Sequence, residues 1–359
     1  TYLVTGGLSG FGWATAEWLI EQGARNLVLL GRRTPEETGV SEQLAIQLAA
    51  GVHIHTIQVD VSHEEAMQDV FEEIAFTSNL PPIRGIFHCA GILDDALVQN
   101  LNEERIGRVL EAKAQGAIIL DRLVQGMDLD YFVLFSSVTT VLGNVGQSAY
   151  IAANAVLGAV AANRWKDGEA ALAVDWGAIA DVGMLSRNET AARALEAAGL
   201  KGMTAHDALD HLPEMLALEL PEVACVEIDW KKWAQIVPGA NVLARFSLVR
   251  LADASNGATS ERLATLSALP EDERLPYVVE QVKVLIAQTL HLEPTSIDDR
   301  ARLSELGIDS LAGVELQTAL RVEFGVEVSI LVLARDESIR KMSQFLLNRV
   351  KIGQTAQLP

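Results

Sequence analysis

Short apolar segments of strand length alternate with segments of helical periodicity over the first 230 residues. We expect strands at residues 2–4, 26–30, 52–59, 85–88, 131–135, 171–175 and 223–228. Strands that alternate with helices form parallel sheets, because a crossover must carry the chain back to the start of each new strand. We therefore predict an α/β protein with a doubly wound parallel sheet, whose ligand crevice lies at the carboxyl ends of the strands.

A change in composition divides the chain. Residues 252–268 are small and polar without periodicity, which is typical of a linker. Beyond them, apolar residues at positions 278, 282, 285, 286 and 290 have the spacing of a helix. We predict a first domain over residues 1–250, a linker over 251–269, a small helical domain over 270–350 and a tail over 351–359.

Composition and charge argue against several classes of function. The chain is 49% hydrophobic and 21% charged, which is typical of a globular protein. Its net charge of −20 argues against a nucleic-acid partner. Cys89, Cys225 and the seven histidines form neither a disulfide framework nor a metal-binding pattern. No apolar run is long enough to span a membrane, and we expect a cytoplasmic protein. Because Thr1 leads at once into a strand, we expect the chain to be a segment of a longer polypeptide.

A glycine-rich loop lies between the first strand and the first helix. It contains the residues that we expect to bind a dinucleotide, namely Thr5, Gly6, Gly7, Gly10, Phe11 and Gly12. Glycines allow a tight turn and the close approach of a pyrophosphate to the helix N-terminus. Such a loop alone is equally typical of ordinary turn chemistry. Its place between strand and helix, with Asp60-Val61 and Ala90-Gly91 after later strands, favours cofactor binding.

Arg32 and Arg33 follow the second strand, where NAD-specific proteins carry an acid for the ribose 2′-hydroxyl. A guanidinium at this place would bind the 2′-phosphate of NADPH through paired hydrogen bonds. The alternative is a pair of solvated surface arginines. Because the acid is missing, the sequence favours NADPH as the cofactor.

The segment after the fifth expected strand contains the residue types of a proton-transfer site. Ser137 follows that strand, Tyr150 lies thirteen residues later in an alanine-rich helical segment, and Asn154 follows Tyr150 by four. A spacing of four places Tyr150 and Asn154 on one helical face, so that both side chains can address one site.

The stretch FSSVTTVLGNVGQSAYIAAN, residues 135–154, resembles the serine–tyrosine core of short-chain dehydrogenases/reductases with one change. Those enzymes usually carry lysine four residues after the tyrosine, where this chain has Asn154. The exchange is similar to that in ketoreductase domains of modular and iterative polyketide synthases. There the lysine lies upstream, and Lys113 in EAKAQGA is the matching residue. The resemblance covers residues 1 to about 250 and implies a Rossmann-like sheet of the short-chain reductase type.

The resemblance implies a role for each of these residues. Tyr150 would be the general acid. A free tyrosine has a pKa of about 10, and a nearby ammonium such as that of Lys113 favours the phenolate and can relay a proton. Ser137 would hold the carbonyl oxygen together with Tyr150. Asn154 would fix Lys113 or a water.

Ser310 lies in Gly307-Ile308-Asp309-Ser310-Leu311, which resembles the phosphopantetheine attachment site of acyl carrier proteins. The alternative is a serine that only caps a helix. The resemblance implies a small four-helix-bundle carrier domain, with 4′-phosphopantetheine attached to Ser310 by a phosphopantetheinyl transferase. It also implies an acyl thioester substrate and, as partners, an upstream non-catalytic ketoreductase subdomain and other domains of the same synthase.

Leu93, Asp94 and Asp95 follow the Ala90-Gly91 turn. In the resembling ketoreductases an LDD triplet at this place marks the B type, which forms the D-configured alcohol. A-type enzymes carry tryptophan at the position of Leu142. The alternative is that the two aspartates only cap the next helix.

These features predict the NADPH-dependent reduction of a β-ketoacyl thioester, carried on Ser310, to a D-β-hydroxyacyl thioester during polyketide chain extension. Three alternatives remain open. The chain would be the equivalent segment of an iterative enzyme similar to fatty-acid synthase, a free-standing dehydrogenase of diffusible alcohols, or a cofactor-binding scaffold without turnover.

Overall fold

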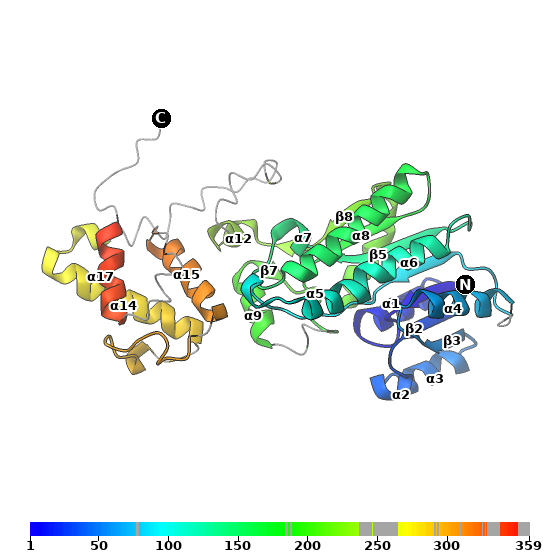
Figure 1. The fold of residues 1–359 in the computed structure, drawn as a ribbon, viewed down its shortest axis with the longest axis horizontal. Helices are drawn as coiled ribbons and strands as arrows, with labels where there is room; N and C mark the ends of the chain where they lie inside the picture. Colours follow the sequence, from blue (N-terminus) through cyan, green and yellow to red (C-terminus); the bar gives the residue numbers. More distant parts are fainter. Residues whose placement is uncertain are drawn as a thin grey trace. The chain divides into compact units, whose positions relative to one another are not determined.

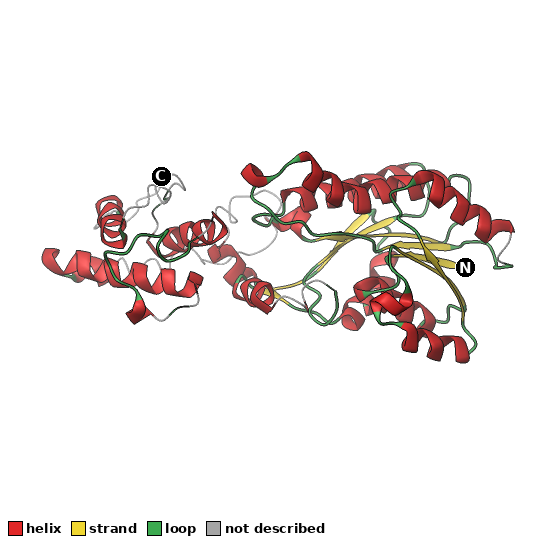
Figure 2. Cartoon of the chain, turned by 60° about the horizontal axis from the view of Figure 1, so that its bottom comes forward, coloured by secondary structure: helices red, strands yellow, loops and turns green. Residues whose placement is uncertain are grey.

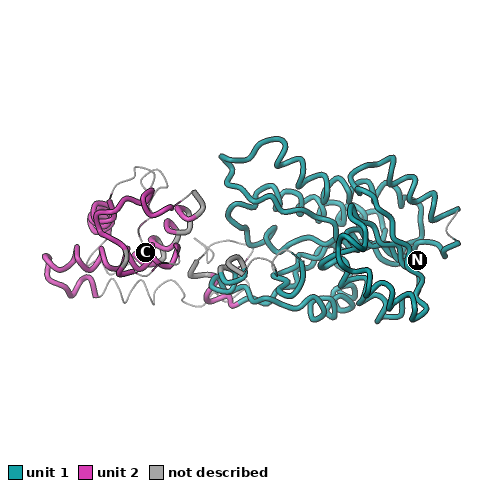
Figure 3. Tube along the Cα trace, turned by 90° about the horizontal axis from the view of Figure 1, so that it is seen from below, with its two compact units in different colours: residues 1–228 teal, residues 229–359 magenta. Residues whose placement is uncertain are grey.

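The computed structural model describes the chain apart from residues 77–78, 184–185, 187–188, 237–245, 247–264, 291, 293, 309, 325, 327, 329–337 and 351–359. The chain divides into two compact units, Thr1–Ile228 and Asp229–Pro359 (Figure 3). Each unit has a hydrophobic core of its own.

The described residues of the first unit form a seven-stranded parallel sheet, which confirms the predicted doubly wound α/β fold (Figure 1). Its strands are β1 (Tyr2–Thr5), β2 (Asn26–Gly31), β3 (His53–Gln58), β4 (Gly85–His88), β5 (Tyr131–Ser137), β6 (Leu172–Trp176) and β8 (Glu222–Cys225). Their order in space is β3-β2-β1-β4-β5-β6-β8. The direction of winding reverses between β1 and β4, and such a switch point opens a crevice at the carboxyl ends of the strands.

Helices cover both faces of this sheet (Figure 2). One face packs against α1 (Gly10–Glu21), α3 (Ser41–Ala49), α10 (Ala205–Asp210) and α11 (Leu212–Ala217). The other packs against α4 (Glu64–Phe76), α6 (Gly116–Leu123) and α8 (Ser148–Lys166). Because both faces are buried, the strands are apolar on both sides. In β2, for example, Leu29 belongs to the core on the face covered by α1, and Val28 belongs to the core on the face covered by α8.

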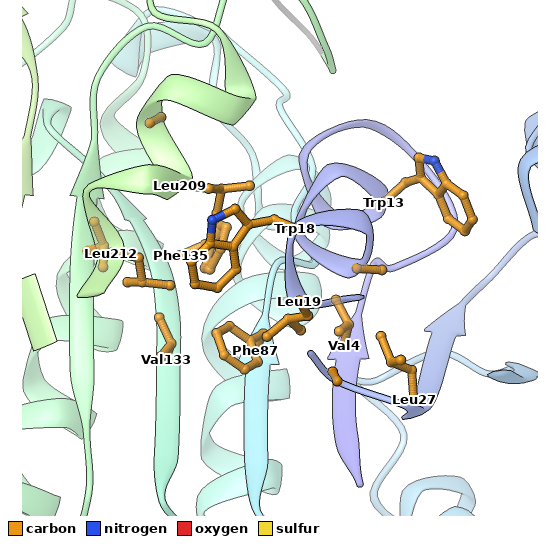
Figure 4. Close-up of a cluster of buried hydrophobic side chains, with 14 of the residues drawn as sticks. Val4, Trp13, Trp18, Leu19, Leu27, Phe87, Val133, Phe135, Leu209 and Leu212 are labelled. Atoms are coloured by element: carbon orange, nitrogen blue, oxygen red, sulfur yellow. The ribbon is translucent and has the colours of Figure 1, made fainter. Parts of the chain in front are cut away.

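The core on the face covered by α1 contains large side chains of that helix. Figure 4 shows Trp18 of this helix beside Leu209 of α10. The indole N–H of Trp18 donates a hydrogen bond to Asp210, 3.1 Å away. A buried indole needs such a partner, and this bond therefore helps to fix α10 against α1.

The predicted strand over residues 223–228 is two strands. β8 ends at Cys225, whose carbonyl accepts a hydrogen bond from Gly177 N–H just beyond the end of β6. After this point β6 offers no further backbone to pair with. The chain turns at Val226, and β9 (Glu227–Ile228) pairs antiparallel with β7 (Leu200–Lys201) in a separate ladder.

The helical segment between β4 and β5 changes its winding in the middle. It consists of α5 (Glu103–Leu110), a π-helical turn (Glu111–Gln115) and α6. A π-turn inserts a residue into the helical repeat and frequently marks a functional site. Lys113 lies in this turn.

The second unit is helical in the residues described. Its longest described helices are α14 (Glu271–Leu290), α15 (Ser310–Phe324) and α17 (Ile339–Arg349), with a short 3₁₀ turn at Pro294–Ser296. The helix expected from the apolar spacing between positions 278 and 290 begins earlier, at Glu271, and its first turn carries three acids that interact favourably with a helix N-terminus. All three helices contribute to one core, among them Val282, Leu316 and Leu346.

The boundary between the units differs from the predicted linker. The first compact unit ends at Ile228 and the second begins at Asp229, directly before α12 (Trp230–Ile236). Residues 251–264 of the predicted linker and the predicted tail 351–359 lie outside the described residues. The domain limits given by the sequence therefore stay a prediction.

Candidate active site

The glycine loop after β1 is shaped by close backbone contacts. A Cβ atom at Gly12 would lie 2.2 Å from the carbonyl oxygen of Gly6, and one at Gly6 would lie 3.0 Å from the backbone nitrogen of Ala90. Gly6 has a φ of 67° and Gly10 a φ of 53°, a region that favours glycine. No larger residue fits this turn without a shift of the backbone.

The N-terminus of α1 is suited to a bound anion. Its first turn carries no acid, and Ser9 at the N-cap makes no side-chain capping bond. The helix dipole and the N–H groups at this end are therefore not neutralised by the helix's own side chains. Phe11 has a different place, because its ring packs edge-on against Phe135 and Trp176, with ring centroids 5.1 Å apart in each case. These features fit the pyrophosphate of a dinucleotide.

Asp60 and Arg32 lie together beyond the ends of β3 and β2. The Nη1 atom of Arg32 is 4.0 Å from Oδ2 of Asp60. Burial by itself would raise the pKa of Asp60, but hydrogen bonds from the N–H and hydroxyl of Ser62, together with the charge of Arg32, lower it below its ordinary value. Arg32 and Arg33 are exposed, whereas Val61 is buried. Asp60 is thus ionised beside the accessible guanidinium of Arg32, and the binding of a cofactor by Asp60, Arg32 and Arg33 stays a prediction.

Lys113 and Tyr150 meet although 37 residues separate them. The Nζ atom of Lys113 lies 5.2 Å from the centroid of the Tyr150 ring, and the lysine is buried. A Cβ atom at Gly91 would be 3.3 Å from Nζ, which places the ammonium beside the turn after β4. The pair predicted from the sequence is therefore brought together beside the turn after β4.

Small side chains allow this approach. Ala114 of the π-turn packs in one cluster with Ala149 and Ala153 of α8. Alanine lets two helices come closer than larger residues do. The alanine-rich character of the α8 segment thus serves the contact between Tyr150 and the turn that carries Lys113.

Ser137 is the last residue of β5 and is buried. Its Oγ accepts hydrogen bonds from the N–H of Thr139 at 3.3 Å and from the Thr139 hydroxyl at 3.0 Å. Because a hydroxyl has two lone pairs and one proton, these bonds leave the Ser137 proton free to be donated. The next residue, Thr140, donates to Oδ2 of Asp175 at 2.9 Å. Burial raises the pKa of Asp175, although its hydrogen bonds oppose the shift.

The side chain of Asn154 makes a hydrogen bond within its own helix. Its Nδ2 donates to the carbonyl of Tyr150 on the same helix, 2.8 Å away, and not to a group of the Lys113 turn. Its Oδ1 is buried and has no hydrogen-bond partner among the described residues. A buried amide oxygen needs a donor, and the role of fixing Lys113 or a water stays a prediction.

The loop of Leu93, Asp94 and Asp95 is tied to two elements. The Asp94 carboxylate accepts hydrogen bonds from Arg105 and Arg108 of α5, which lower its pKa below the ordinary value. Asp95 accepts one from Gln147 Nε2, just before α8, at 2.9 Å.

The alternative interpretation of the two aspartates as helix caps does not hold. The N-cap of α5 is Asn102, whose side chain accepts from the N–H of Arg105. The N-cap of the 3₁₀ turn Val98–Asn100 is Leu97. Asp94 and Asp95 instead fix the shape of the loop.

Ser310 is the first residue of α15 in the second unit. The preceding turn ends at Gly307, which has a φ of 78°. Asp309 lies outside the described residues. The position of Ser310 at a helix N-terminus is the one where a phosphodiester is stabilised by the helix dipole.

Sequence reasoning did not identify Thr139, Arg105, Arg108 or Gln147 as parts of the site. Thr139 is two residues from Ser137, and a Ser-x-Thr spacing at the end of a strand is the one signal that would have pointed to it. The arginines and Gln147 reach the loop over 11 to 52 residues of sequence. No local pattern reveals such contacts.

Two further features are absent from the described residues. None of their helices has both the length and the apolar character needed to cross a membrane. They contain no group of three or more His, Cys, Asp or Glu side chains placed to hold a metal ion.

Two family models match the chain. The KR domain model matches residues 1–181, and the phosphopantetheine attachment site model matches residues 280–346. The chain is 35% identical over 335 residues to polyketide synthase GfsB of Streptomyces halstedii, covering 91% of this chain and 6% of that protein. It is 32% identical over 349 residues to 6-methylsalicylic acid synthase of Aspergillus terreus, covering 91% of this chain and 19% of that protein. The chain thus spans less than a fifth of these relatives.

Solved ketoreductase structures are similar to the chain as well. An A1-type ketoreductase is 36% identical with a TM-score of 0.61, covering 65% of this chain and 48% of that chain. The ketoreductase from the first module of phoslactomycin biosynthesis in Streptomyces sp. HK803 is 30% identical with a TM-score of 0.64, covering 70% and 57%.

Proposed function

The chain belongs to the KR domain family, the ketoreductases, and from this premise we propose that it is the ketoreductase and acyl carrier segment of a polyketide synthase. Its reaction is the NADPH-dependent reduction of a β-ketoacyl thioester to a D-β-hydroxyacyl thioester. The observation that carries the proposal is the buried Lys113 ammonium 5.2 Å from the Tyr150 ring, beside the turn that follows β4.

Tyr150, Lys113 and Ser137 have different roles in proton transfer and substrate orientation. Tyr150 donates a proton to the oxygen of the substrate carbonyl, and Lys113 favours the phenolate that remains. Ser137 donates its free proton to the same oxygen, while Thr139 holds the Ser137 hydroxyl in place. The reduced nicotinamide bound at the glycine loop would supply the hydride.

The second unit supplies the substrate tether. A phosphopantetheinyl transferase would attach phosphopantetheine to Ser310, and the thioester would reach the reductase on this arm. Tethering raises the effective substrate concentration to roughly millimolar, so that weak intrinsic binding suffices. We propose the other domains of the same synthase, including a non-catalytic ketoreductase subdomain, as partners and the cytoplasm as the location.

The Tyr150→Phe variant tests the proposed reaction. We expect NADPH binding to be unchanged and the reduction rate to fall by about 10²–10⁴-fold, because one positioned acid is lost. The measurement is NADPH oxidation with a free β-ketoacyl thioester. Tyr131→Phe, which also removes a tyrosine hydroxyl but at the first residue of β5, is the matched control and should keep the wild-type rate. A near wild-type rate for Tyr150→Phe would contradict the assignment.

Arg32 and Arg33 are proposed to select NADPH through its 2′-phosphate. Replacing both with alanine should raise the KM for NADPH by about 10- to 100-fold, which corresponds to one or two charge-assisted hydrogen bonds. The KM for NADH should change little, since NADH lacks the phosphate. Arg122→Ala, an exposed arginine paired with Glu64, is the control. Equal weakening of both cofactors would show that the arginines do not bind the 2′-phosphate.

Ser310→Ala should abolish the attachment of phosphopantetheine and leave the reduction of a free thioester intact. The intact mass of the protein is measured after incubation with coenzyme A and a phosphopantetheinyl transferase. Ser304→Ala, six residues upstream, should still gain the mass. Loss of both properties in Ser310→Ala would indicate a structural cap rather than a tether.

The configuration of the product is proposed from the loop of Leu93, Asp94 and Asp95. A nicotinamide held by the glycine loop would supply hydride from one side, so the side from which the pantetheine arm enters would select the carbonyl face. The contacts of Asp94 with Arg105 and of Asp95 with Gln147 give this loop one shape at the edge of the crevice. The chain is similar to A1-type structures in its overall fold. The choice between A and B type is instead inferred from this loop and from Leu142, at the side where the pantetheine arm would enter.

We therefore expect the D-configured alcohol. The product of NADPH-dependent reduction is released from its thioester and separated by chiral chromatography against standards of both configurations. A product that is mainly L-configured would overturn the B-type assignment while leaving the ketoreductase assignment intact.

A further inference from the structure

His88 is a fully buried titratable residue that the proposed reaction does not use. It is the last residue of β4, and its side chain is closed off from solvent. Its Nε2 lies 2.9 Å from the carbonyl oxygen of Lys113, and its Nδ1 lies 2.7 Å from the hydroxyl of Thr5. The imidazole therefore bridges the start of the glycine loop and the π-turn.

The direction of each hydrogen bond follows from the chemistry of the partners. A carbonyl oxygen only accepts, so Nε2 carries the proton and donates to Lys113. Burial, assisted by the nearby Lys113 charge, lowers the pKa of His88 to about 4, and the ring is neutral at pH 7. Nδ1 then accepts from the Thr5 hydroxyl, whose oxygen accepts from the N–H of Ala90 at 3.3 Å. Three hydrogen bonds run in one direction from Ala90 to Lys113.

The space around the ring is fitted to this bridge. A Cβ atom at Gly116, three residues after Lys113, would lie 3.0 Å from Cε1 of His88 and 2.8 Å from Cγ2 of Val61. The glycine in EAKAQGA therefore allows the Cε1–Nε2 edge of the ring to approach the helical segment. Since the ring is enclosed, its length sets the separation between the end of β4 and the π-turn.

We propose that His88 is a positioning residue, which holds the π-turn by the Lys113 carbonyl and thereby fixes the Lys113 ammonium beside Gly91 and Tyr150. This inference rests on the proposed role of Lys113 in the reduction. The competing view is a histidine that only fills the core and satisfies its hydrogen bonds. If His88 positions the π-turn, turnover depends on the Nε2 bond to Lys113. If His88 only fills the core, loss of either ring-nitrogen bond should have a similar effect.

Two amide substitutions separate the nitrogens. In His88→Gln the amide nitrogen occupies about the position of Nε2 and can still donate to Lys113. In His88→Asn the shorter amide reaches only about the position of Nδ1, so that the contact with Thr5 can persist while the Lys113 contact is lost. Both variants retain one of the two bonds, and both are checked for folding by their thermal unfolding midpoints.

Two measurements are made on each variant of the whole chain. Hydrogen–deuterium exchange of the peptide that spans residues 111–118 reports how firmly the π-turn is held and needs no enzymatic activity. The kcat for reduction of a free β-ketoacyl thioester with NADPH reports the position of Lys113. We expect faster exchange and an about 10²-fold lower kcat for His88→Asn, because misplacement by about 1 Å can cost this much. His88→Gln should remain within a few-fold of wild type in both.

Gly116→Ala provides a second variant in which His88 itself is intact. Its new methyl group displaces the ring from the helical segment, so we expect faster exchange and a lower kcat, as for His88→Asn. Equal behaviour of the Gln and Asn variants would overturn the proposal, as would a loss of kcat with wild-type exchange. If the wild-type chain does not reduce the thioester, the proposed function fails, and the exchange measurement still decides whether His88 holds the turn.

Discussion

Parallel pairing brings the carboxyl ends of neighbouring strands to one edge of the sheet, and the candidate site depends on this alignment. Thr5 ends β1 and pairs in register with His88, which ends β4. Ser137 ends β5, the next strand along. The register also explains why the Thr5 hydroxyl reaches the His88 ring, since paired residues of adjacent strands lie side by side. The start of the glycine loop and Ser137 thus lie at the same edge of the sheet.

Because Lys113 and Tyr150 lie on different helical segments, their approach depends on contacts between those segments. In a helix, residues four apart share one face, so a lysine four residues after Tyr150 would reach the tyrosine without help. Lys113 must instead be supported by contacts between elements. The alanine cluster of Ala114 with Ala149 and Ala153 provides the close approach, and the π-turn sets the direction of the side chain.

Much of the first unit could be predicted because its signals are local. Continuous apolar strands, the glycine loop and the four-residue spacing of Tyr150 and Asn154 depend on short-range geometry, and the parallel sheet was confirmed. The π-turn could not be predicted, because EAKAQGA has the composition of an ordinary helix and the irregularity arises where the turn meets His88 and α8. The break between β8 and β9 depends on where β6 ends, which is a tertiary property.

The same helical segment serves both ends of the proposed reaction. Arg105 and Arg108 of α5 hold Asp94 in the loop of Leu93, Asp94 and Asp95, and Lys113 follows Arg108 by five residues, inside the π-turn. A shift of this segment would move this loop and the ammonium together. In the proposed reaction, the loop that would select the carbonyl face and the ammonium beside Tyr150 are thus both held by one continuous helical segment rather than by two independent loops.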